Sequence, residues 1–121
     1  MNASTTRLRC VAAEQHDERQ CDAAVSRAFS VLGKRWNGMI LDVLGEGALS
    51  FVGLRRAVTG ISDAVLSDRL VELADAGLVV REVDAGPPVA VSYTLTDAGV
   101  RLVPILAQLG AWADGNLSAS R

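Results

Sequence analysis

The stretch ISDAVLSDRLVELADAGLVVRE, residues 61–82, decides the fold of this chain. Its apolar residues recur at every third or fourth position as far as Leu73, which is the spacing of one face of an α-helix. Ser62 suits the N-cap of such a helix, and Gly77 suits the left-handed position just after its end. The valine-rich run after Gly77 favours a β-strand. The stretch therefore predicts a short helix that leads directly into a strand.

Three further helices are predicted before this stretch. Apolar residues recur at helical spacing over residues 22–32, 34–44 and 50–58, and glycines follow the first two segments. Ser50 suits the N-cap of the third helix. The second helix is expected to carry its apolar side chains on one side, namely Trp36, Met39, Ile40, Val43 and Leu44.

A hairpin and a final helix are predicted after the stretch. Two runs rich in valine and threonine flank DAGPP, residues 84–88, and a helix follows from near Thr96. The ALSF segment, residues 48–51, is long enough only for a brief extended piece. The order is helix, helix, short strand, helix, helix, hairpin, helix, so a helix-turn-helix pair is followed by a wing. The predicted fold class is mainly α with a small β-hairpin wing, a winged helix-turn-helix that dimerises through its terminal helices.

Length and composition limit what such a chain can do. At 121 residues, half of them apolar, it can build one compact core but not two ordinary domains. We expect a mobile or partly helical polar arm over residues 1–20, a winged-helix domain over 21–115 and a tail over 116–121. Twelve basic and 14 acidic residues give a net charge of −2, which does not by itself mark a nucleic-acid-binding protein. No apolar run approaches the roughly 20 residues that cross a bilayer, so a cytoplasmic protein without membrane association is expected.

Residues capable of chemistry are few and scattered. The sequence has no nucleophile with a neighbouring base, no phosphate-binding loop and no set of metal ligands, so neither an enzyme nor a bound metal or cofactor is predicted. His16 stands alone as a surface histidine. Cys10 and Cys21 are separated by ten residues without a nearby group of histidines. They are expected to be reduced thiols rather than a disulfide scaffold or a zinc site.

An ordered set of motifs resembles a known family. The motifs are LGKRWNGMIL, FVGLRRAVTGIS, VLSDRLVELADAGLVVRE, GPPVAVSYTLTDAG and LVPILAQLGAWA. Together they resemble the HxlR-type branch of the MarR-like winged-helix transcription regulators, from Cys21 to Ala113, about three quarters of the chain. No single motif is diagnostic, but the ordered set is specific.

The resemblance implies that double-stranded DNA is the partner. In such proteins the second helix of the pair lies in the major groove with its first residues at the base edges, and the wing touches the neighbouring minor groove or backbone. The groove-facing candidates would be Ser62, Asp63, Ala64, Ser67 and Asp68. Arg55 and Arg56, at the end of the preceding helix, would be the first candidates for phosphate contacts, with Arg69 and Arg81 as further DNA-binding candidates.

Each assignment to DNA has an alternative. Arg55 and Arg56 could form a solvated edge, and Arg69 could brace Glu72 or Asp75 instead of reading the groove. Arg81 could be an ordinary exposed charge on a strand. Between residues 50 and 82, four arginines meet five acidic residues, so the segment is not locally basic.

The sequence also departs from the family pattern. Relatives often carry a basic residue where this chain has Ala64, and an arginine in the wing where it has VAVS around Ala90. Each lost phosphate contact flattens the salt dependence of DNA binding by about one unit of slope. Affinity is therefore expected to depend on dimerisation or on a narrow target sequence.

Cys21 is a candidate redox-sensing residue, because some relatives use a cysteine at this place to sense quinones, aldehydes or oxidants. The start of a helix favours the thiolate and lowers a thiol pKa, whereas the neighbouring Asp22 acts in the opposite direction. A packed and inert cysteine is the alternative. Cys10 could at most act as a resolving partner.

Dimerisation is predicted from apolar side chains that a small core cannot cover. A twofold dimer would place two recognition helices about one turn of DNA apart, roughly 34 Å, on an inverted repeat. The alternative is that Trp112 only caps its own core. The candidate interface residues are Val25, Phe29, Leu102, Ile105, Leu106, Leu109 and Trp112.

The sequence therefore predicts a sequence-specific DNA-binding transcriptional regulator. A homodimeric repressor, released by an electrophile, an oxidant or another small effector, is the reading we favour. The alternative is a winged-helix module that binds protein partners and little DNA.

Overall fold

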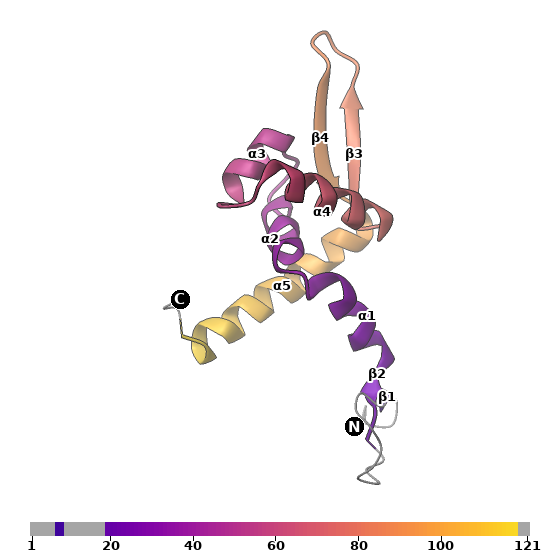
Figure 1. Cartoon of the computed structure of the whole chain (residues 1–121), viewed down its shortest axis with the longest axis vertical. Coiled ribbons are helices and arrows are strands. Elements are labelled where there is room, and N and C mark those ends of the chain that lie inside the picture. Colours follow the sequence, from indigo (N-terminus) through magenta and orange to yellow (C-terminus); the bar gives the residue numbers. More distant parts are fainter. Residues whose placement is uncertain (1–6, 9–18, 119–121) are drawn as a thin grey trace. The chain divides into compact units, whose positions relative to one another are not determined.

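The computed structural model describes residues 7–8 and 19–118 (Figure 1). It divides into two units, with the boundary in the sequence between Lys34 and Arg35. The expected arm and tail lie largely outside the described residues.

The first unit contains a short hairpin and one helix. Strand β1 (Arg7–Leu8) pairs antiparallel with strand β2 (Cys21–Asp22). The expectation of a mobile or partly helical arm is therefore wrong at Arg7–Leu8, which is a strand. Helix α1 (Ala23–Leu32) begins because the Asp22 carboxylate accepts hydrogen bonds from two backbone N–H groups of the first turn, at 2.7 and 3.2 Å. None of the ten residues of α1 is buried.

The second unit contains the predicted winged helix. Its helices are α2 (Arg35–Leu44), α3 (Phe51–Ala57), α4 (Asp63–Asp75) and α5 (Asp97–Asn116), with strands β3 (Val79–Asp84) and β4 (Ala90–Leu95) between α4 and α5. The predicted caps are confirmed: the hydroxyls of Ser50 and Ser62 accept backbone N–H groups of α3 and α4 at 3.0 and 3.2 Å. No helix in the described part of the chain is both long and apolar enough to span a membrane.

The core of the second unit lies where α2, α3, α4 and the base of the hairpin meet. Leu66, Leu70 and Leu73 form the buried stripe of α4, as the sequence predicts. The remaining buried apolar residues come from α2, α3, the turn after α3 and the first residue of β3: Ile40, Leu41, Leu44, Leu54, Val58, Ile61 and Val79.

The predicted inner side of α2 is partly wrong. The buried side holds Asn37, Ile40, Leu41 and Leu44, which recur at helical spacing, while Met39 is 47% exposed. The prediction differed because it placed large apolar residues such as Met39 on the buried side and left out the polar Asn37. Trp36 is half-buried, and the Arg35 guanidinium lies 4.5 Å from its ring centroid.

The end of α4 directs the chain into the wing. Gly77 has a positive φ of 80°, its N–H donates to the Ala74 carbonyl, and the Leu78 N–H donates to the Leu73 carbonyl. This pair of hydrogen bonds is a Schellman motif, which satisfies the last carbonyls of the helix and turns the chain sharply. The hairpin then runs from Val79 opposite Leu95 to its tip beyond α4 (Figure 1).

A third extended segment joins the base of the wing. Leu49, in the predicted ALSF segment, forms an antiparallel bridge with Tyr93 of β4 through two backbone hydrogen bonds of 3.1 and 2.8 Å. Because Leu49 directly precedes the N-cap of α3, this bridge ties the wing to the start of the helix pair.

Candidate nucleic-acid interface

Helices α3 and α4 form a helix-turn-helix pair joined by a tight turn. Gly60, at φ +95°, allows the reversal that side-chain-bearing residues rarely adopt. Ile61, before the N-cap of α4, is buried with Leu66 four positions into the helix, which is the arrangement of a hydrophobic staple. The turn is thus fixed by both backbone and packing, and α4 has a defined start.

The outer face of α4 is polar and open. Ser62, Asp63, Ala64, Ser67 and Asp68 are all exposed, so the structure brings the predicted groove-facing residues together on one surface. Ser62 uses its oxygen as an acceptor for the Val65 N–H. Its hydroxyl hydrogen remains available as a donor. DNA contact by these residues stays a prediction.

Arg55 and Asp63 form an ion pair across the turn. One guanidinium nitrogen, Nη1 of Arg55, lies 2.9 Å from Oδ1 and 3.1 Å from Oδ2 of Asp63. The two side chains are 41% and 62% exposed, so the pair faces solvent. Sequence reasoning treated the two as separate DNA contacts and missed their pairing. The available signal was two opposite charges, one at the end of a helix and the other at the start of the next.

Two other predicted DNA-binding arginines lie on α3 and α4, and they differ in their ion pairing. The Nη1 atom of Arg69 lies 2.7 Å from the Oε1 atom of Glu72. The two side chains are 21% and 26% exposed. The bracing alternative for Arg69 is therefore confirmed, with Glu72 as the partner. Arg56 is exposed on α3 and forms no ion pair with the described residues. It remains the freer cation for a phosphate.

The wing is more apolar than a DNA-binding wing need be. Arg81 lies on β3 opposite Tyr93 and is exposed. Around it, Val80, Val83 and Val89 are 40%, 54% and 69% exposed. Sequence reasoning noted the missing arginine but not this apolar surface.

Cys21 is disulfide-bonded, so the expectation of reduced thiols is wrong. Cys21 also pairs with Leu8 in the short β1–β2 hairpin. Cys10, the other cysteine of the sequence, lies outside the described residues. In the described part of the chain, no three His, Cys, Asp or Glu side chains gather as metal ligands.

Apolar side chains remain uncovered on α5 and on α1. On α5, Ile105, Leu109 and Trp112 are 57%, 48% and 54% exposed, while Leu102 and Leu106 are half-buried. Trp112 is therefore only partly covered within its own unit. In the first unit, Val25 and Phe29 are exposed by more than half.

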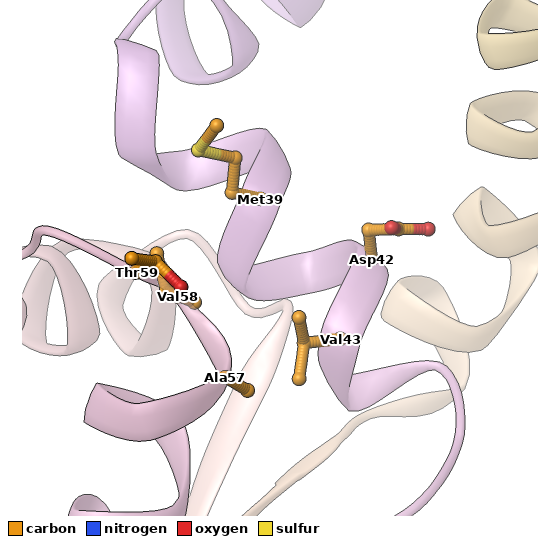
Figure 2. Close-up of a pocket in the computed structure, with 6 residues that line it drawn as sticks. All are labelled: Met39, Asp42, Val43, Ala57, Val58 and Thr59. Atoms are coloured by element: carbon orange, nitrogen blue, oxygen red, sulfur yellow. The ribbon is translucent and has the colours of Figure 1, made fainter.

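Two hollows flank α2. One, of about 340 Å³, is lined by Met39, Asp42 and Val43 of α2 and by residues 57–59 at the end of α3. Figure 2 shows Val43 on the side of α2 that faces Ala57, with Asp42 pointing away. The other, of about 420 Å³, lies between α2 and α5 and is more apolar. It is lined by Arg35, Gly38, Met39, Asp42, Leu106, Ala107, Leu109, Gly110 and Ala113.

Sequence comparisons match this chain to helix-turn-helix regulators. Residues 31–121 match the model of the HxlR-like helix-turn-helix family. The HTH-type transcriptional regulator YodB of Bacillus subtilis (strain 168) is 44% identical over 87 residues, which cover 72% of this chain and 78% of that protein.

Solved structures agree with the sequence match. The reduced form of YodB from B. subtilis has a TM-score of 0.73 at 39% identity, covering 81% of this chain and 96% of that one. The redox regulator HypR in its oxidized form has a TM-score of 0.73 at 32% identity, covering 79% and 99%. YodB has also been solved diamide-treated and quinone-bound, with TM-scores of 0.66 at 40% and 39% identity, covering 78% and 76% of this chain and 94% and 96% of those chains.

Proposed function

This chain belongs to the HxlR-like helix-turn-helix family and is a DNA-binding transcription regulator of that type, and we propose that it is a homodimeric repressor of an inverted-repeat operator. The observation that carries the proposal is the open polar start of α4, fixed beside the exposed arginines of α3 by a tight turn. This is the geometry that places the first residues of a recognition helix against base edges. The chain is proposed to act by occupying DNA and not by catalysis.

The dimer is supported by the apolar surface of α5. Ile105, Leu109 and Trp112 lie in the same helix with about half of each side chain in water. A contiguous apolar surface of this kind is typical of an interface. A twofold axis would place two α4 helices roughly 34 Å apart, which matches successive major-groove faces of one side of the duplex.

Selection of bound sequences from random duplex DNA tests the proposal. The expected result is enrichment of two inverted half-sites whose centres lie one helical turn, or a multiple of one, apart. Binding of the selected duplex, followed by fluorescence anisotropy, should weaken steeply as salt is raised. A substituted protein in which Arg55→Ala and Arg56→Ala are combined should bind more weakly and with a shallower salt dependence.

A protein-binding module is the second candidate, because the wing exposes Val80, Val83 and Val89 and the chain is acidic overall. The same selection separates the two. A module of this kind would enrich no sequence, and its DNA affinity would be weak and uniform.

We also propose that the redox state of Cys21 controls DNA binding. The proposal rests on the disulfide bond of Cys21 and on the oxidant-treated and quinone-bound forms in which the relative YodB has been solved. With diamide as oxidant, two thiols lose two protons and two electrons to the N=N bond, which becomes a hydrazine, and one S–S bond forms. Because Cys21 immediately precedes the N-cap of α1, closing or opening that bond changes the constraint on the start of this helix.

The redox proposal is tested on the wild-type protein, Cys21→Ser and Cys10→Ser. Diamide should change the operator affinity of the wild type about tenfold, reversibly with dithiothreitol, and leave Cys21→Ser unchanged. An equal response in the wild type and Cys21→Ser would contradict it.

A further inference from the structure

The acidic residue at the start of α4 needs an explanation in a helix that approaches DNA. Asp63 is the first residue of α4, follows the N-cap Ser62 directly, and is 62% exposed. An isolated carboxylate there would be repelled by phosphates. Its charge is balanced by Arg55, whose Nη1 contacts both carboxylate oxygens.

We propose that Asp63 recognises a cytosine in each operator half-site and that Arg55 is a positioning residue that holds the Asp63 carboxylate for this contact. The inference rests on the proposed function and deepens it, because it assigns one base to one side chain. It also gives Arg55 a different task from the phosphate contact predicted from the sequence.

The chemistry of the carboxylate selects the base. A carboxylate offers about four acceptor positions, of which the single Arg55 nitrogen occupies at most two. The free positions accept only N–H or O–H donors. In the major groove cytosine presents an amino donor, whereas guanine presents acceptors at O6 and N7 and thymine presents an acceptor at O4. Adenine has an amino donor but places the N7 acceptor beside it, which repels the second oxygen.

The ion pair limits how the carboxylate can turn. Arg55 lies in the last turn of α3, and Asp63 lies at the start of α4, so their contact spans the turn that fixes the two helices. With both oxygens held by one donor at 2.9 and 3.1 Å, the carboxylate has a preferred orientation before DNA arrives. A held carboxylate cannot turn to suit a wrong base, which improves discrimination, and fewer rotamers are lost on binding, which improves affinity.

Other charges of α4 do not share this arrangement. Asp68 is exposed on the same helix without an ion pair to the described residues, and Arg69 is paired with Glu72. Asp75, at the end of α4, is an exposed acid far from the first turn and provides a matched control.

The experiment measures operator affinity by anisotropy after each half-site position is changed to all four bases. The wild type should lose about tenfold when the cytosine facing Asp63 is replaced, a loss in the range of one base contact. Asp63→Ala should bind all four bases within about threefold at that position. Asp63→Asn should prefer adenine, because an amide pairs with the N6 and N7 groups of that base. Asp75→Asn should keep the wild-type preference.

The role of Arg55 is tested by whether its substitution lowers base discrimination or lowers affinity for all sequences. As a positioning residue, Arg55→Ala should reduce discrimination at the same base position to below about threefold while other positions keep theirs. Arg55→Lys, which retains the charge, should restore part of it. Circular dichroism and thermal unfolding would establish that every variant is folded.

Two results would overturn the inference. One is an unchanged base preference in folded Asp63→Ala and Asp63→Asn. The other is a uniform loss of affinity for all sequences in Arg55→Ala with a salt slope smaller by about one unit, since that is the signature of a phosphate contact. Failure of the proposed function itself looks different, because the wild-type protein would then select no DNA sequence at all.

Discussion

The side-chain hydroxyl of Thr96 donates a 2.6 Å hydrogen bond to the carbonyl oxygen of Gly77. The same oxygen of Thr96 accepts the Gly99 N–H at 3.1 Å as the N-cap of α5. One residue therefore starts α5 and fastens it to the end of α4, at the base of the wing.

Replacing Thr96 by valine should destabilise the protein. The change keeps the shape but removes both the cap and the bond to Gly77, and the expected loss in the free energy of unfolding is about 2 kcal/mol. Urea unfolding followed by circular dichroism measures it. Thr96→Ser keeps the hydroxyl and should lose under about 1 kcal/mol; equal losses for the two variants would contradict the hydrogen-bond account.

Gly99 should not tolerate a side chain. It is buried, and a methyl group added there would collide with the Leu78 carbonyl and press on the Leu95 side chain. Gly99→Ala is expected to cost about 1–3 kcal/mol of stability through overpacking. The control is Gly115→Ala, also in α5, where the added methyl meets nothing within 4 Å. It should be neutral or stabilising by up to about 1 kcal/mol, because alanine favours helices; a larger loss than in Gly99→Ala would refute the packing argument.

Arg56 should contribute one phosphate contact. It is exposed on α3 beside the ion-paired Arg55. Arg56→Ala should lower affinity equally for operator and mutant operators, and reduce the slope of log affinity against log salt by about 0.9. Arg101→Ala, an exposed arginine on α5, serves as the control and should leave the slope unchanged. A changed base preference in Arg56→Ala would show that the residue reads bases.

The dimer prediction is tested on α5. Trp112→Ala should raise the dimer dissociation constant tenfold or more, since buried tryptophans are among the residues that dominate interfaces at about 2 kcal/mol apiece. Leu109→Ala should raise it less, because leucine is rarer among such residues. Sedimentation velocity over a range of concentrations measures the constant. Val71→Ala, equally apolar and 63% exposed but on α4, should have no effect. A monomeric wild type at every concentration would remove the dimer from the proposal.

Local chemistry made much of the fold predictable. Ser50, Ser62 and Gly77 begin or end helices through contacts within a few residues, and each lies where its own properties place it. The stripe of leucines in α4 likewise needs only helical spacing. These features depend on short-range physics, so a single sequence is enough to find them.

The features that the sequence analysis missed depend on where separate segments meet. The pairing of Leu8 with Cys21 and the contact of Arg55 with Asp63 each bring together residues that periodicity does not relate. In α2, Asn37 is buried at helical spacing with Ile40, Leu41 and Leu44, a place that its polarity alone does not predict. Of the candidate site, the list of exposed residues could therefore be predicted, but their pairing could not.

The two backbone hydrogen bonds between Leu49 and Tyr93 have a mechanical consequence. They clamp the hairpin to the residue before the N-cap of α3, so the wing cannot swing independently of the helix pair that is proposed to enter the major groove. A duplex whose grooves are spaced differently must then bend or twist to fit, and stiff sequences would resist. The protein would in this way favour pliable DNA even at base pairs that no side chain touches.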